Sequence, residues 1–259
     1  MVSKRAVHSR ESADKDFIKW RSRFQVATSA FEMGELKEAR TLLFRLLEVA
    51  KTLDDNDFAI PASQLGIAIV SMEQGKLEES REYFDQGLSA LSSSSDPACQ
   101  ELYAAGLRFF AIWHEKQDRL EEAERILRDS IERLKRLGNE TAVQLAYSIC
   151  DLCFVLIRQE RMDEAEKLIE SALDILKVTV GKDDPKYDWA KMLYKACLQQ
   201  EEELKADAIE FLTQQLQWKA GPNHPNLVRA VTAYEAALHK RGMVERIETA
   251  RERFTSILR

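Results

Sequence analysis

The sequence predicts an all-α fold, a solenoid of about six stacked antiparallel helical hairpins. Breakers of secondary structure are few, with 9 Gly and 5 Pro among 259 residues, and the segments between them are rich in strong helix formers. A short charged phrase also returns about every 42 residues, and two series of small residues keep the same period. A repeated hairpin cannot bury its apolar face alone, so neighbouring hairpins are expected to stack.

The recurring phrase marks the turn between the two helices of each hairpin. It appears as "EMGELKEARTLL", "EQGKLEESREYF", "EKQDRLEEAERIL" and "RQERMDEAEKLI". The apolar residue after the turn recurs at intervals of 41, 43, 42 and 42 residues, at Leu36, Leu77, Leu120, Met162 and Leu204. Gly34 and Gly75 are predicted to end a first helix in a left-handed cap, and Asp118-Arg119 and Glu160-Arg161 occupy the same turn in later units.

Small residues predict where the two helices of a hairpin cross. One series lies on the second helices, at Ala39, Ser80, Ala123, Ala165 and Ala208. The other lies twelve residues earlier on the first helices, at Ala27, Ala68, Ala111, Cys153 and Ala196. Small side chains let two backbones approach, and the large apolar residue four positions after the second-helix member fills the adjacent groove. The charged runs of the second helices are spaced for solvated faces with i,i+4 pairs.

These signals place the elements along the chain. Residues 1–16 are expected to form a short, basic and flexible tail, and residues 17–259 are expected to form a single solenoid domain. Linkers are expected at 92–97, 181–185 and 221–225. Each ends one helix and places a proline in the first turn of the following helix, and Asp96 is a candidate N-cap. The last repeat has two possible registers, one through Val244 and one through Ala250. The repeats are expected near 17–53, 57–93, 97–137, 139–179, 185–220 and 225–259.

The repeats resemble those of the tetratricopeptide repeat family. Ala123-x-x-x-Leu127 and its equivalents match the small-x-x-x-large signature of that family's second helix. The period, nearer 42 than 34, and the linkers "GKDDP" and "GPNHP" are similar to those of kinesin light chains. The aromatic residue near the start of the family's first helix is mostly missing, and Cys153 replaces one small residue. The resemblance implies a right-handed superhelix whose first helices line a concave wall.

Composition argues against several classes of partner. The net charge is −6 and basic residues are mixed with acidic ones, so no basic stripe for nucleic acid is present. No apolar run approaches the roughly 20 residues of a membrane span, and the N-terminus lacks the apolar segment of a secretory signal. Four cysteines lie among helix formers, which indicates a reducing cytoplasm.

The sequence contains no convincing arrangement for catalysis, a cofactor or a metal. Cys150-x-x-Cys153 is the sole metal-like spacing, and it lacks a second ligand pair, so we interpret Cys153 as a core residue. The histidines have no shared helix face, and no nucleophile motif or phosphate loop occurs. We therefore expect a protein that is not an enzyme and that uses no cofactor.

The first helices are apolar nearly all round, which predicts a binding wall. Positions spaced to face the concave groove, with cations near its rim, are expected to bind a protein or peptide partner. They are Leu65, Ile69, Met72, Arg108, Ile112, Lys116, Cys150, Phe154, Ile157, Arg158 and Leu193.

Other interpretations compete with this one. The same apolar side chains could pack on one another across a narrow superhelix, which would leave no open groove. The protein could also be a self-associating structural component, or a regulatory module that responds to a small peptide. A monomer or a weak homo-oligomer is expected.

Overall fold

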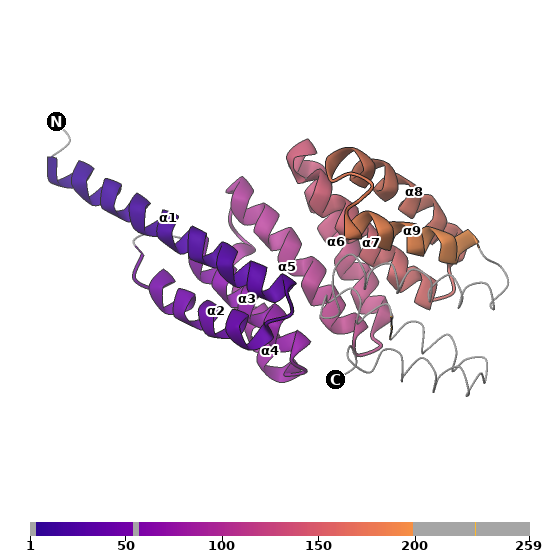
Figure 1. Cartoon of the computed structure of the whole chain (residues 1–259), viewed down its shortest axis with the longest axis horizontal. Helices are drawn as coiled ribbons and strands as arrows, with labels where there is room; N and C mark the ends of the chain where they lie inside the picture. Colours follow the sequence, from indigo (N-terminus) through magenta and orange to yellow (C-terminus); the bar gives the residue numbers. More distant parts are fainter. Residues whose placement is uncertain (1–3, 54–56, 199–230, 232–259) are drawn as a thin grey trace. The chain divides into compact units, whose positions relative to one another are not determined.

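A computed structural model describes residues 4–53, 57–198 and 231, with the backbone alone over 4–14, and all regular elements in these residues are helical (Figure 1). The chain divides into two compact units, Met1–Trp113 and His114–Arg259, and each is treated by itself. The predicted domain boundaries stay predictions. The first helix begins at Lys4, inside the segment expected to be a tail.

The first unit is built from consecutive packed helices. α1 packs against α2, α2 against α3, and α3 against α4, while α1 also contacts α3. The bounds are α1 (Lys4–Glu32), α2 (Leu36–Ala50), α3 (Ala59–Glu73), α4 (Leu77–Leu91) and α5 (Pro97–Glu115), whose last two residues belong to the second unit.

The second unit continues the same pattern. α6 packs against α7, α7 against α8, and α8 against α9. The predicted second helix of the fifth repeat and the repeat near 225–259 lie outside the described residues. The bounds are α6 (Leu120–Leu137), the 3-10 helix η1 (Asn139–Thr141), α7 (Ala142–Arg158), α8 (Met162–Thr179) and α9 (Pro185–Leu198).

Four hairpin turns have the same geometry, as the repeated phrase predicts. Gly34, Gly75, Asp118 and Glu160 all have positive φ, between 60° and 77°. After each, the next backbone N–H donates to the carbonyl five residues earlier, as in Glu35 to Ala30 at 2.8 Å. This is the Schellman motif. The polar residues Asp118 and Glu160 therefore take the conformation that glycine takes in the first two turns, at the steric cost of a Cβ atom.

The small-residue series lies where the helices cross. Every described member of both series is buried, and Ser80 Oγ donates to the carbonyl of Ala68 at 2.7 Å. Cys153 Sγ donates to the carbonyl of Ala165 at 3.4 Å, twelve residues away as in the other pair. The large residues four positions later, among them Phe84 and Ile169, are fully buried. The predicted crossing is confirmed, and Cys153 is a core residue whose burial raises the pKa of its thiol.

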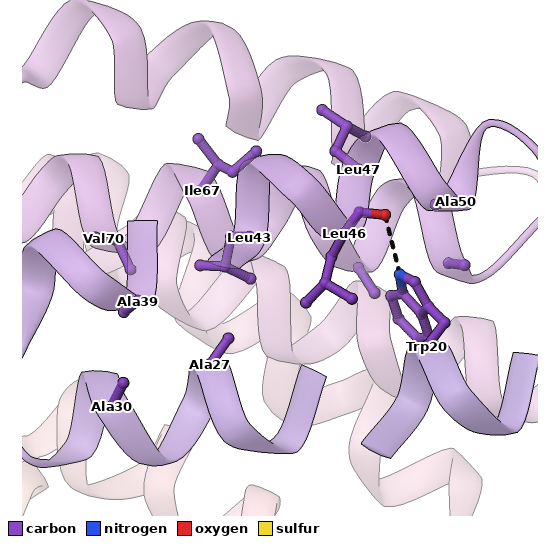
Figure 2. Close-up of a cluster of buried hydrophobic side chains, with 12 residues drawn as sticks. Trp20, Ala27, Ala30, Ala39, Leu43, Leu46, Leu47, Ala50, Ile67 and Val70 are labelled. Carbon is purple, nitrogen blue, oxygen red and sulfur yellow. Dashed lines mark hydrogen bonds between the residues drawn. The ribbon is translucent and has the colours of Figure 1, made fainter. Parts of the chain in front are cut away.

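The core of the first unit lies between α1, α2 and α3. Figure 2 shows the indole of Trp20 on α1 beneath the end of α2, where its Nε1 donates to the carbonyl of Leu46 at 3.2 Å. Ala27 and Ala30 of α1 point toward α2, and Ala27 and Ala39 are almost completely buried. The hydrogen bond satisfies the one polar atom of the indole, so this large ring can be buried at little cost.

Two helix starts follow the predicted linkers. Asp96 Oδ1 accepts a hydrogen bond from the backbone N–H of Cys99 at 3.0 Å, so Asp96 caps α5, whose first residue is Pro97. Gly181 has φ 87° and Pro185 opens α9. A proline needs no hydrogen-bond acceptor in the first turn of a helix, which is why it is tolerated there.

Within the part of the chain that the structure describes, one helical stretch has the length and composition of a membrane span, although the sequence predicted no such run. It is Asn139–Arg158, with a mean hydropathy of 1.5, and 61% of its apolar window is buried inside the structure. Because α7 packs against α6, α8 and α9, this apolar character is explained by a central place in the second unit.

Candidate partner-binding surface

The structure buries most of the apolar side chains that were predicted to face a groove. Six of the eleven predicted residues are no more than 7% exposed, and they belong to the core of their own unit. They are Leu65, Met72, Ile112, Cys150, Phe154 and Leu193. These six side chains are buried against neighbouring helices of their own unit, and their role as partner contacts stays a prediction.

Leu65 was predicted to face the groove, but its side chain is packed in the core. Its side chain lies between two glycines, Gly87 on α4 and Gly106 on α5. A Cβ atom added to either glycine would stand 2.8 or 2.9 Å from Leu65, which is too close for a van der Waals contact. The two helices therefore approach Leu65 because they lack side chains at these points. Leu65 holds three helices of the first unit together.

Phe154 has a similar place in the second unit. Its ring lies 5.7 Å from the ring of Trp189 on α9, at an interplanar angle of 45°, and the residue is 5% exposed. Trp189 is also buried, at 3%. This aromatic pair joins the first helices of two successive repeats, so it contributes to stacking of the repeats.

Five predicted residues remain at least partly accessible. Ile69, Arg108 and Ile157 are half-buried, Lys116 is exposed, and the side chain of Arg158 is 31% exposed. Ile69 and Arg108 lie in the first unit, whereas Lys116, Ile157 and Arg158 lie in the second. Their role as partner contacts stays a prediction.

Arg158 already has two carboxylate partners. Its guanidinium forms an ion pair with the buried Glu115 and another with the exposed Asp118, at 2.7 Å. It also donates to the carbonyl of Glu115 at 3.1 Å. Because Glu115 is only 6% exposed, this pair is largely shielded from water and a ligand carboxylate would have to compete with it. Arg158 thus fixes the turn after α5 to the end of α7.

Arg108 and Lys116 are the other two cations among the predicted residues. The Cζ atom of Arg108 lies 4.1 Å from the centre of the Phe109 ring, within the range of a cation–π contact. Lys116 follows the last residue of α5 and is exposed. Both cations could approach an acidic or carboxylate group of a ligand.

A closed ring of charges joins α6 to the start of α8, and it was not anticipated. Arg128 pairs with Glu124 at 2.8 Å and with Glu164 at 2.5 Å, while Arg161 pairs with Glu124 at 2.7 Å and also with Glu164. The i,i+4 spacing predicted the pair within α6, but it says nothing about partners 36 or 37 residues away. The sequence signal would have been opposite charges 36 or 37 residues apart, which is five or six residues short of the repeat period.

The ring shifts the pKa values of its members. Burial acts to raise the pKa of Glu124, but hydrogen bonds from Arg128 and Arg161 outweigh it and the pKa is lowered. Hydrogen bonding from Arg128 is the main cause of the lowered pKa of Glu164. Both arginines have raised pKa values because of the same bonds. The ring is a structural clamp between repeats, because all its charges are satisfied internally.

The described residues offer little for small-molecule chemistry. They contain no group of three or more His, Cys, Asp or Glu side chains that could hold a metal ion. A shallow cavity of about 280 Å³ lies between α1 and the end of α2, where the cation Lys19 is already paired with Asp16. Its lining is Asp16, Lys19, Trp20, Arg23, Val49, Thr52 and Leu53.

A second accessible apolar surface lies on α1, and sequence inspection missed it. Ile18, Val26 and Met33 are 64%, 56% and 60% exposed. Their spacing of eight and seven residues places them on one side of the helix, and that spacing is the signal that would have found them.

Comparison with known proteins agrees with this architecture. The tetratricopeptide repeat family model matches residues 145–186, which contain most of α7, all of α8 and the start of α9. The sequence matches no curated protein.

Solved structures share the fold at low sequence identity. A Rap protein in complex with competence and sporulation factor is 11% identical with a TM-score of 0.74, and the match covers 92% of this chain and 63% of that one. The apo form of RapI is 14% identical with a TM-score of 0.69, and 98% of this chain and 89% of that one are covered.

A third structure also shares the fold. It is a putative kinesin light chain with nearly identical TPR-like repeats from Podosopora anserina, 20% identical, with a TM-score of 0.54 over 77% of this chain and 95% of that one. At these identities the likeness concerns the fold alone. Together with the matched repeat, it shows that this chain is similar to the tetratricopeptide repeat proteins with the longer, kinesin-light-chain-like repeat, as its sequence predicted.

Proposed function

We propose that this protein is a non-catalytic scaffold that binds a protein or peptide along the surface formed by the first helices of its repeats, in the cytoplasm. The observation that carries the proposal is the shared fold with the Rap protein solved with competence and sporulation factor, which extends over 92% of this chain. A related Rap regulator, of the plasmid pLS20, was solved with the Phr* peptide. A fold that presents rows of helices is suited to an extended ligand of this kind.

The accessible first-helix residues define how such a ligand would be held. Ile69 and Ile157 offer apolar contacts, and Arg108 and Lys116 offer positive charge for acidic or terminal carboxylate groups. The buried residues Leu65 and Phe154 act on binding indirectly, since they fix the helices that carry these contacts.

The regulatory alternative is favoured by the same comparisons. A peptide that contacts several repeats would stabilise one arrangement of the helices over others, because a ligand shifts a conformational equilibrium by its differential affinity. In this view the scaffold senses a peptide and presents a second surface to a target. Peptide binding to the first helices is common to both versions.

Selection from a displayed library of random peptides, with the full chain as bait, tests the proposal. Selected peptides should bind Ile157→Asp or Lys116→Glu at least about tenfold more weakly than the unmodified chain, as for anchor residues of an interface. Val178→Asp is the matched control, since Val178 is 86% exposed on the second helix α8. Selected peptides that bind all these variants equally well would place the site elsewhere.

A further inference from the structure

The exposed face of α1 is apolar where the other first helices are covered. We define the α1 stripe as Ile18, Ser22, Val26, Ser29 and Met33, which follow one another at intervals of four, four, three and four residues and are all exposed. Trp20 and Ala27 lie on the other side of the helix and are 1% exposed, packed in the core with α2. Among the described residues, three of the four large apolar side chains with high exposure belong to this stripe.

The same positions form the stacking face in later repeats. In α3, 41 residues on, Ile67 and Val70 replace Val26 and Ser29, and both lie in the buried cluster with Leu43 of α2 (Figure 2). Gln74, at the position of Met33, donates through Nε2 to the carbonyl of Leu36, the first residue of α2.

The second unit repeats this arrangement. In α7, 126 residues after α1, Ser148 occupies the position of Ser22, and its hydroxyl lies 3.2 Å from that of Ser130 on α6. Leu152 and Val155, at the positions of Val26 and Ser29, are 1% exposed. The stripe on α1 is therefore the surface to which the second helix of a preceding repeat would bind. On α1 this face carries the exposed apolar residues Ile18, Val26 and Met33.

We propose that the α1 stripe binds the α1 stripe of a second copy of this chain, with the two helices antiparallel about a two-fold axis. Four of the five stripe residues are symmetric in sequence about a point between Gln25 and Val26, and Val26 lies next to that point. Antiparallel pairing places Ile18 of one copy opposite Met33 of the other, and Ser22 opposite Ser29. Small serines between the apolar ends allow the two backbones to approach, as in other close helix pairs.

Charge complementarity favours this register. Arg21 and Glu32 are exposed, lie on the same flank of the stripe, and form no ion pair within the part of the chain that the structure describes. In a two-fold antiparallel pair the same flanks of the two helices meet. Arg21 of one copy then lies about 3 Å along the axis from Glu32 of the other, at 1.5 Å per residue. The symmetry gives two such pairs.

The size of the surface sets the strength of the association. A stable interface buries about 800 Å² on each partner, and a stripe on one helix offers less than this. The dimer is therefore reversible and depends on concentration. It uses a face distinct from the first-helix surface proposed for peptide binding, so the two proposals can fail independently.

Sedimentation velocity of the full chain over a wide range of concentration tests the proposal. The unmodified chain should show a monomer–dimer equilibrium, and Val26→Glu should weaken it by more than about tenfold, because a charge would be buried in both halves of the interface. Val178→Glu, at the other highly exposed apolar residue, should leave the equilibrium unchanged. Circular dichroism melts establish that both variants remain folded.

The register has its own test. Arg21→Glu should weaken the dimer, and Arg21→Glu combined with Glu32→Arg should restore it. Ser22→Cys protein mixed with Ser29→Cys protein should oxidise mainly to the mixed disulfide, because the four natural cysteines are buried.

Several results would overturn the inference. A chain that stays monomeric at all concentrations, or a dimer that is insensitive to Val26→Glu, would show that this stripe does not bind a second copy. Preferential Ser22→Cys homodimers would exclude the antiparallel register. Open-ended oligomers would indicate head-to-tail stacking, in which the stripe binds another helix of the chain instead of its own equivalent.

Discussion

Replacing Phe154 with alanine distinguishes a core position from an open groove. Phe154 is 5% exposed and its ring packs on Trp189 of α9 at 5.7 Å. Truncation of a buried phenylalanine costs about 3–5 kcal/mol of unfolding free energy, and the aromatic pair contributes about 0.5–1.5 kcal/mol of this. We therefore expect Phe154→Ala to lower the stability of the second unit by about 3 kcal/mol or more.

Urea titrations measure this effect. Far-UV circular dichroism reports helix content, and intrinsic fluorescence reports the surroundings of all four tryptophans, one of which is Trp189. Together the two probes measure the loss of unfolding free energy. Val178→Ala is the control, because Val178 is 86% exposed and its truncation should change stability by no more than about 0.5 kcal/mol.

The outcome that would refute the packing argument is clear. If Phe154→Ala changes the unfolding free energy as little as Val178→Ala does, the side chain is largely wet in solution. A loss of peptide binding in such a stable variant would then identify Phe154 as a groove contact, as the sequence first suggested.

Three further changes test other features of the structure. Ala165→Leu should cost about 1–3 kcal/mol in denaturant titrations, because Ala165 is completely buried at the α7–α8 crossing; a neutral effect would contradict the repeat register. Gly75→Ala should cost about 1 kcal/mol in thermal melts, since Gly75 has φ 75° and no atom lies within 4 Å of the added Cβ, which leaves the backbone strain alone; no loss would mean that the turn relaxes. Glu124→Gln should cost about 1 kcal/mol or less at neutral pH. Because the pKa values of Glu124 and Glu164 are lowered from 4.5, their contribution is present above that pH and is lost as the pH falls below it, so the difference from the unmodified chain should shrink in acid. A difference that persists in acid would exclude the ion pairs as its cause.

The hairpin architecture could be predicted because its signals are local. A turn that needs positive φ favours glycine, and a close helix crossing needs small side chains, so both leave marks at fixed places in each repeat. The same conformation and the same burial are kept where the residue type differs. Asp118 has the positive φ of Gly75, and Cys153 is buried at a crossing position that is alanine in other repeats. The repeat was therefore visible although no single residue is common to all units.

The binding surface was harder to predict because burial depends on neighbours that lie far away in sequence. Leu65 and Ile69 are four residues apart on one helix face and are both apolar, but only Leu65 meets the glycines of α4 and α5. Arg158 lies at the rim as expected, but its charge is already paired with Glu115 and Asp118. Hydrophobic periodicity identifies which side chains are apolar; it does not identify which of them a neighbouring helix will cover.

Because apolar periodicity does not show which side chains are covered, the exposed apolar residues of α1 became apparent only in the structure. Apolar residues at the stacking positions of α3 and α7 are accounted for by α2 and α6, which cover them in the structure. Ile18, Val26 and Met33 have the same pattern on α1 without a covering helix. A monomer would gain solubility if these three residues were polar, because exposed apolar stripes promote association. Burial by another helix would account for apolar residues at these positions. The near-symmetric order of residues along the stripe favours α1 of a second copy as that helix.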